Sequence, residues 1–85
     1  APDASYWLGE IYILQGRTQS ALPYFLKSLN EYPENNKVVA AQYKLGQIYY
    51  KLGDEPLARK MLMLASRDSS AIGIKAKDFL KRKNL

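Results

Sequence analysis

Few residues of this chain have the chemistry for catalysis or metal binding. Its 85 residues include no Cys and no His, which excludes thiol nucleophiles, disulfides, the usual zinc sites and His-based acid–base catalysis. The closest acidic groupings are Asp54 with Glu55 and Glu31 with Glu34. Both fall at helix ends or in turns, where acidic side chains serve as caps and favour the helix dipole. With no Gly-rich phosphate loop either, the sequence predicts no catalytic residue, no metal site and no cofactor.

The positive charge of the chain is concentrated at its C-terminal end. The formal net charge is +5, and residues 71–85 hold five Lys or Arg against one acid, Asp78. A basic end can attract an acidic protein, a nucleic acid or an anionic membrane surface. Short charge runs are more often a solvated helix face. Nucleic-acid and membrane-surface binding therefore stay as minor alternatives, and no nucleic acid partner is expected. No apolar run is long enough for a transmembrane segment.

A seven-residue phrase occurs twice in the chain. Residues 6–12 read YWLGEIY and residues 43–49 read YKLGQIY, which places the copies 37 positions apart. A Gly follows four residues after each copy, and an Ala follows five residues after that Gly. Self-similarity at a fixed period of this length is typical of repeat proteins built from stacked helical or mixed units.

Hydrophobic spacing predicts five helices and no strand. Gly16 and Gly53 are expected to end the first and third helices, because Gly readily takes the left-handed conformation of a helix C-terminus. The predicted segments are residues 3–15, 19–31 and 37–52, one that Asp54 caps, and one that begins near Ser70, its cap.

Two Pro residues bear on the boundaries of the second helix. In a helix interior Pro removes a hydrogen bond and clashes with the preceding turn. Pro23 is therefore expected in the first turn, with Ser20 as the cap, and the alternative is a bent helix with Pro23 in its interior. Pro33 is expected to end the helix, since a residue before Pro is pushed away from α geometry. Residues 33–36 then form a turn, in which Asn36 caps the third helix.

Each predicted helix carries an apolar stripe that is expected to face the core. The fourth is apolar on nearly every side and should be covered on more than one face. The fifth has a charged face opposite its stripe, as a terminal capping helix would. The stripes comprise Ala4, Leu8, Ile11 and Tyr12; Ala21, Phe25, Ser28 and Tyr32; Val38, Ala41, Leu45, Ile48, Tyr49 and Leu52; Leu57, Ala58 and residues 61–65; and Ile72, Ala76, Phe79 and Leu80.

Gly9 and Gly46 stand in the middle of predicted helices, where Gly costs about 1 kcal/mol relative to Ala. Small residues there, facing Ala21 and Ala58 of the second helices, would let paired helices approach closely. The side chains expected to fill the space around them are Leu8 and Leu45, Tyr12 and Tyr49, and Phe25 and Leu62. Each repeat is then a helix, a Gly-containing turn and an antiparallel helix, and such pairs stack into a solenoid. Because arrays normally need about three units, we expect an earlier repeat before Ala1 or self-association into a homo-oligomer.

The pattern resembles the tetratricopeptide repeat (TPR). The residues that carry the resemblance are Leu8-Gly9, Tyr12, Ala21, Phe25 and Pro33, and in the second copy Leu45-Gly46, Tyr49, Ala58, Leu62 and Ala65. The period of 37 is longer than the usual 34, and Ser70 stands where Pro33 would recur. The resemblance implies an all-α, TPR-type α-solenoid in one domain over residues 1–85. It consists of a first repeat (2–34), a second repeat (37–68) and a C-terminal capping helix (70–83).

A narrower resemblance explains the longer period. The string PDASYWLGEIYILQG, followed by ALPYF, EYP and YKLGQIYYKLGD, is similar to the C-terminal TPR domain of the periplasmic Tol-Pal system coordinators. It implies a non-enzymatic scaffold for protein–protein interaction in a bacterial periplasm or cell envelope. The last turn departs from the family, with SRDSSA in place of a YPGT-like sequence. Alternatives are the TPR module of an outer-membrane assembly lipoprotein or of another complex, and a cytoplasmic location for a generic TPR module.

The resemblance also implies where a partner binds. In the family, the first helix of each repeat lines a concave groove that holds a peptide or helix of another protein. Carried over by position, the groove residues are Tyr6, Glu10 and Ile13, and in the second copy Tyr43, Gln47 and Tyr50. Aromatic residues recur as interface anchors. The alternative for each Tyr, as for Trp7, is packing against the neighbouring repeat. The Lys and Asn clamp that some TPR proteins use for a C-terminal carboxylate is absent from these positions.

Overall fold

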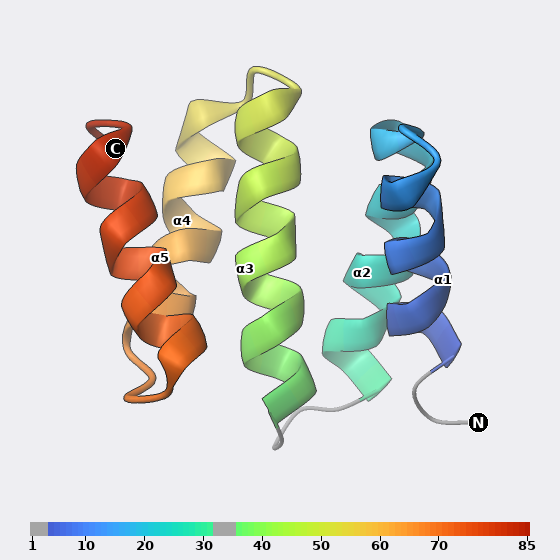
Figure 1. Ribbon diagram of the computed structural model, residues 1–85, viewed down its shortest axis with the longest axis horizontal. Helices are drawn as coiled ribbons and strands as arrows, with labels where there is room; N and C mark the ends of the chain where they lie inside the picture. The colour runs from blue at the N-terminus through green and yellow to red at the C-terminus, as the bar shows by residue number, and fades with distance from the viewer. Residues whose placement is uncertain (1–3, 32–35) are drawn as a thin grey trace.

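The structure, a computed structural model, describes residues 4–31 and 36–85 (Figure 1). Five α-helices make up most of these residues, which include no strand, so the prediction of an all-α fold is confirmed. The burial of Tyr32, the turn at 33–36 and the cap by the Asn36 side chain lie outside the described part. The helices are α1 (Ala4–Leu14), α2 (Thr18–Glu31), α3 (Asn36–Lys51), α4 (Glu55–Ser66) and α5 (Ala71–Arg82).

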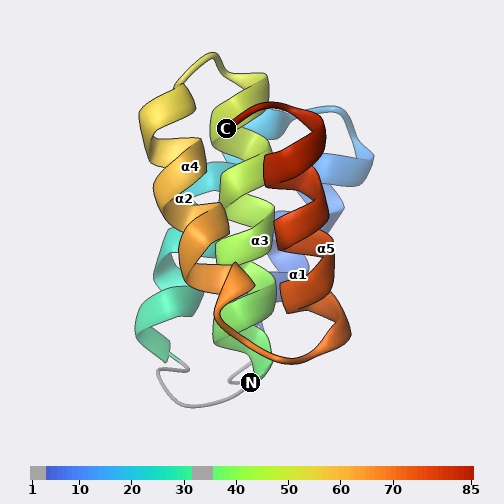
Figure 2. The ribbon, with the colours of Figure 1, turned by 90° about the vertical axis from the view of Figure 1, so that its left-hand side faces the viewer.

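The helices form two layers, one of α2 and α4 and the other of α1, α3 and α5 (Figure 2). Consecutive helices pack against each other along the chain, and α3 also contacts α5. Figure 2 shows α2 and α4 on one side and α1 and α5 on the other, with α3 between them. In Figure 1, α1 and α5 flank α3. The face that these three helices share is therefore concave, with α3 as its floor.

The helix ends agree with the predicted turn and cap chemistry. Gly16 and Gly53 have φ of 74° and 89°, the left-handed conformation expected after α1 and α3. Asp54 caps α4, because its Oδ1 accepts a hydrogen bond from Leu57 N at 3.2 Å. Ser70 caps α5 by accepting one from Gly73 N at 3.4 Å.

The predicted place of Pro23 in a first turn after Ser20 is wrong. α2 begins at Thr18, so Pro23 lies inside it. Ala21 N donates to the Arg17 carbonyl at 3.1 Å, which starts the helix earlier than the sequence suggested. The bond that Pro23 cannot make is the one to the carbonyl four residues before it, at Gln19. Both residues are exposed, so water can satisfy that carbonyl and the loss is tolerated.

The buried core forms two clusters between the layers. The first joins α1, α2 and α3 and includes the fully buried Phe25 and Leu45. The second joins α4 and α5, where Ala76 and Phe79 pack with Leu62. The burial of these two residues shows that α5 packs on the second helix pair, and its role as a terminal cap stays a prediction.

The predicted core stripe of the first helix is wrong at Ala4, Leu8 and Ile11. Leu8 and Ile11 are 41% and 48% exposed, and Ala4 is also exposed. Their counterparts one period later, Leu45 and Ile48, are 0% and 2% exposed. The difference arises because α2 packs on α3, whereas no described helix covers the outer side of α1. The residues that α1 does bury are Ser5, Tyr6 and Gly9.

The prediction that Leu52 is buried is also wrong, because Leu52 follows the end of α3 and is exposed. The prediction that the fourth helix is covered on more than one face is confirmed, since α4 packs between α3 and α5. Leu57 and Met63 lie on its open outer side and are exposed.

Gly9 and Gly46 permit the close approach that the sequence predicted. A Cβ at Gly9 would lie 2.7 Å from Phe25 Cε2, and a Cβ at Gly46 would overlap Leu62 Cγ. Phe25 and Leu62 are both fully buried, so neither side chain has free space to move into. The second helix of each pair therefore places its large side chain directly against the Gly of the first.

Replacing Gly46 by Ala should destabilise the protein by about 1–2 kcal/mol, although Ala usually stabilises a helix interior. The reason is the overlap of the new Cβ with Leu62. Urea unfolding followed by circular dichroism measures the change. Measured against the Leu62→Ala variant, Gly46→Ala should cost much less, because the shorter side chain at position 62 relieves the overlap. An equal cost in both backgrounds would contradict this account of Gly46.

Candidate functional site

Two hollows lie on the concave face, and Lys44 of α3 lines both of them. The smaller, of about 210 Å³, is lined by residues of α1, α3 and α5. The larger, of about 260 Å³, is lined by residues of α1, α3 and the start of α2. Together they are called the trough below. Its lining consists of Tyr6, Glu10, Ala40, Tyr43, Lys44, Ile72 and Lys75 in the smaller hollow, and Ile13, Thr18, Lys44, Gln47, Ile48 and Lys51 in the larger.

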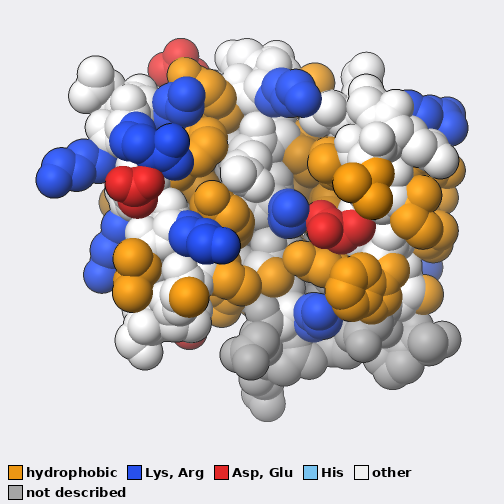
Figure 3. Space-filling view, viewed as in Figure 1, with side chains coloured by type: hydrophobic (Ala, Val, Ile, Leu, Met, Phe, Trp, Pro, Cys, Tyr) orange, Lys and Arg blue, Asp and Glu red, His pale blue; other side chains and the backbone are white. Residues whose placement is uncertain are grey.

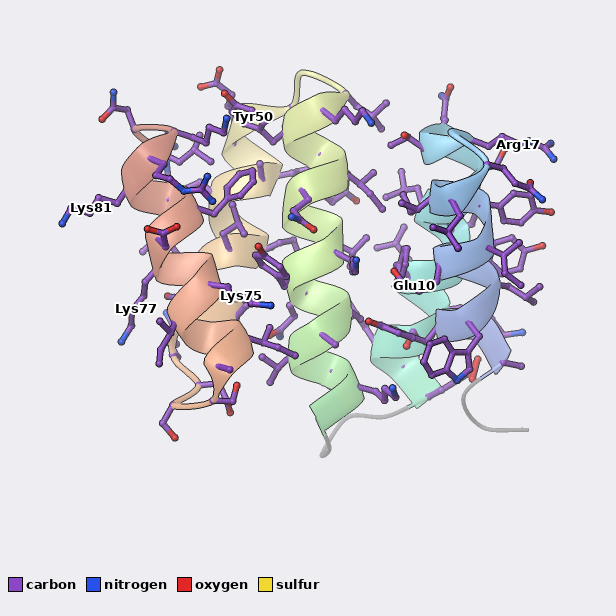
Figure 4. All side chains as sticks on the ribbon, in the orientation of Figure 1. Glu10, Arg17, Tyr50, Lys75, Lys77 and Lys81 are labelled. Carbon is purple, nitrogen blue, oxygen red and sulfur yellow. The ribbon has the colours of Figure 1, made fainter. Side chains whose placement is uncertain are left out.

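The structure brings most of the predicted groove residues together in the trough. In Figure 4, Glu10 projects from α1 toward α3. The predicted groove residues that line the smaller hollow are Tyr6, Glu10 and Tyr43, and those that line the larger are Ile13 and Gln47. Their role in binding stays a prediction, but their placement on one surface is compatible with it.

Tyr50 lines neither hollow. Its ring meets Phe79 of α5 edge-on, with 5.5 Å between the centroids. Lys83 Nζ lies 5.6 Å from the centre of the same Tyr50 ring. The geometry therefore matches the alternative reading for this residue, in which Tyr packs against the neighbouring helix. Tyr43 contacts Phe79 as well, at 6.5 Å, but also lines the trough.

Tyr6 packs mainly in the core, and the part of it that remains accessible lines the trough. It is 8% exposed, and its ring meets Phe25 at 5.5 Å and Trp7 at 5.3 Å, both edge-on. Burial, and to a lesser extent the negative charge of Glu10, raise the pKa of Tyr6. Its phenol therefore stays neutral at physiological pH and keeps a proton to donate. Trp7 is half-exposed, and Lys37 Nζ lies 4.5 Å from the centre of its ring.

An ion pair connects α1 and α3 across the trough. Lys44 Nζ lies 3.1 Å from Glu10 Oε1, and both side chains are 29% exposed. Glu10 Oε1 itself is shielded from solvent, so Lys44 is the cation that balances its charge. Because the pair is partly exposed, its contribution to stability is small, and its main effect is on the charge of the surface.

Several lining residues were not among the predicted ones. Lys51 lies one helical turn after Gln47, so helical spacing alone could have indicated it. Lys75 and Ile72 come from α5, and Thr18 from the start of α2. Their position depends on how the last helix and the first turn pack, and the repeated phrase carries no signal for it.

Most of the basic residues of the helices lie in α1, α3 and α5, the layer that forms the trough. The helices α1, α3 and α5 contain seven Lys or Arg and two acids, whereas α2 and α4 contain three and two. Figure 3 shows basic side chains beside apolar ones on this face. The surface therefore offers apolar contact together with positive charge, which suits binding rather than acid–base chemistry.

Neither a metal site nor a membrane span is found in residues 4–31 and 36–85. These ranges contain no group of three or more His, Cys, Asp or Glu that could hold a metal ion. Each of their helices is too short or too polar to cross a bilayer.

Comparisons with known proteins identify the family of the chain and no individual relative. No curated protein and no solved structure matches the chain. The sequence profile described as Tetratricopeptide repeat matches residues 2–67, which include α1 to α4. The same four helices form the two pairs in which a large side chain packs on a mid-helix Gly. The chain therefore belongs to the tetratricopeptide repeat family.

Proposed function

We propose that this protein is a non-enzymatic scaffold that holds a peptide or helix of a partner protein in the trough. Tetratricopeptide repeats generally mediate protein–protein interactions, and the family is typically non-enzymatic. The observation that carries the proposal for this chain is the pair of hollows joined at Lys44. Their lining combines aromatic, aliphatic and amide side chains on one concave surface, as binding grooves do.

We further propose that the scaffold acts in the assembly or maintenance of a bacterial cell envelope, as the Tol-Pal coordinators do. The support is the resemblance of the sequence, which includes the YWLGE and YKLGQ phrases and the period of 37. The TPR module of an outer-membrane assembly lipoprotein is the second candidate. It would use the same trough and differ in its partner.

Site-specific photo-crosslinking tests the proposal, since a chain without Cys allows one label at a chosen position. Gln47→Cys puts the label in the trough. Lys60→Cys puts it on the exposed side of α4, in the other layer, and is the matched control. Each variant carries a benzophenone maleimide and is irradiated with a bacterial envelope extract or with a cytosolic extract. Mass spectrometry identifies the crosslinked proteins.

We expect the Gln47→Cys label to crosslink a distinct envelope protein that the Lys60→Cys label does not reach. Equal capture by both labels, or capture by neither, would overturn the trough as the binding site. A distinct partner found only in the cytosolic extract would keep the scaffold role and overturn the envelope location.

A further inference from the structure

We propose that the trough selects an acidic segment, a stretch of the partner rich in Asp or Glu with apolar or aromatic residues between them. This inference rests on the proposed function and names the chemistry of the partner. Among the residues that the structure describes, Lys44, Lys51 and Lys75 line the trough against one acidic residue, Glu10. Complementary charge of this kind gives an interface its specificity and speeds association.

The lysines of the trough differ in whether they form an ion pair with an acidic side chain. Lys44 is paired with Glu10 at 3.1 Å. Lys51 and Lys75 are exposed, and neither makes an ion pair with any described residue. In Figure 4, Lys75 points from α5 toward α3, whereas Lys77 and Lys81 point away from α3. The trough therefore presents two ammonium groups to a ligand, one from α3 and one from α5.

Apolar side chains line the same two hollows as these lysines. Ile72 and Tyr43 line the smaller hollow with Lys75, and Ile13 and Ile48 line the larger with Lys51. A ligand that follows the trough therefore meets positive charge and apolar surface together. A peptide with acidic and apolar residues interspersed can match both, because its side chains are of both kinds.

The same features disfavour a nucleic acid or a membrane at this site. Bases need an open aromatic face for stacking. Tyr6 is 8% exposed, and Tyr43 is half-buried beside Phe79, so neither ring is fully open to a base. A flat bilayer surface would meet the flanking helices α1 and α5 before it reached the floor on α3. An acidic peptide is the class of ligand that fits both the shape and the charge.

Fluorescence anisotropy with short labelled peptides tests the inference. One peptide has Leu or Tyr at every third position and Glu elsewhere, and its control has Gln in place of Glu. The variant is Lys51→Glu with Lys75→Glu. The matched control is Lys27→Glu with Lys60→Glu, on exposed positions of α2 and α4. Each pair lowers the net charge from +5 by the same four units, and circular dichroism confirms that both remain folded.

We expect the Glu peptide to bind more tightly than the Gln peptide, and more weakly as salt is raised. The Lys51/Lys75 pair should weaken this binding about tenfold or more, and the Lys27/Lys60 pair by less than about threefold. Glu10→Gln should tighten it about two- to fivefold, because it removes the acid from the trough and leaves Lys44 unpaired.

Three outcomes would overturn the inference. The first is equal weakening by the two Lys pairs, which would mean general attraction to a basic protein. The second is equal affinity for the Gln peptide, which would leave the trough as a binding site without charge selection. The third is tighter binding of oligothymidylate or of phosphatidylglycerol vesicles than of the Glu peptide. Failure of the proposed function is distinguished separately, because the Gln47→Cys label would then crosslink no distinct partner.

Discussion

Replacing Leu45 by Ala is expected to lower the free energy of unfolding by about 3 kcal/mol, whereas the same replacement at Leu8 should lower it by about 1 kcal/mol or less. The two residues occupy the same position of the repeated phrase. Leu45 is fully buried, and Leu8 is 41% exposed. Removing the Leu45 side chain leaves a cavity beneath α2, while water already reaches Leu8. Urea unfolding followed by circular dichroism gives both values.

The comparison also tests whether the outer side of α1 is open in solution. Both replacements remove the same atoms from the same position of a helix, so the difference between them reports burial alone. Equal losses of stability would contradict the structure on this point. They would mean that another copy of the chain covers Leu8, and the loss at Leu8 would then depend on protein concentration.

Replacing Phe25 by Ala should lower the free energy of unfolding by about 3–5 kcal/mol. Phe25 is fully buried, packs on Gly9 and meets the Tyr6 ring edge-on. Its removal therefore takes away the side chain that joins α1 to α2. A domain of this size is stable by only about 5–10 kcal/mol. The unfolding midpoint in urea should fall by roughly half or more.

Leu26→Ala is the control for this prediction. Leu26 is the next residue in α2 and is 38% exposed, so its truncation should cost about 1 kcal/mol or less. Hydrogen exchange adds a second observable, because a stacked array transmits stability mainly between neighbours. Amides of α1 and α2 should lose protection in Phe25→Ala before those of α5 do. A loss at Phe25 no larger than that at Leu26 would contradict the core described here.

The features that could be predicted from the sequence are those that depend on local chemistry. Gly16 and Gly53 end helices because their φ is positive, and Asp54 and Ser70 cap helices because their oxygens reach a backbone N–H three residues on. The contact of Phe25 with Gly9 was also predictable, because a mid-helix Gly needs a compensating close approach. Each of these is determined within one helix or one helix pair.

What the sequence did not predict depends on which helices are neighbours. Helical spacing groups Leu8 with Ile11, but it cannot say whether a second helix covers that face. Pro23 could be placed inside α2 only with knowledge that the carbonyl it leaves unbonded faces water. The exposure of Met63 follows from the packing of α4 between α3 and α5, with its outer side open.

The candidate site also contains residues that the sequence could place and residues that it could not. Glu10 and Gln47 line the trough, on the sides of α1 and α3 that the family resemblance assigns to a groove, and their role in binding stays a prediction. Tyr50 packs on Phe79 instead, and Lys75 enters the lining, because α5 lies closer to α3 than to α1. The last helix is not part of the repeated phrase, so the sequence could not place it against the groove.

The concave face of α1, α3 and α5 is the surface that we propose receives a partner segment. The most direct test is to record amide chemical shifts of the isotope-labelled chain during titration with the captured partner, or with the Glu peptide. We expect the largest changes at Tyr43, Gln47 and Lys75, and almost none at Lys27 and Lys60. Largest changes on α2 and α4, or on the outer side of α1 around Leu8, would contradict this proposal.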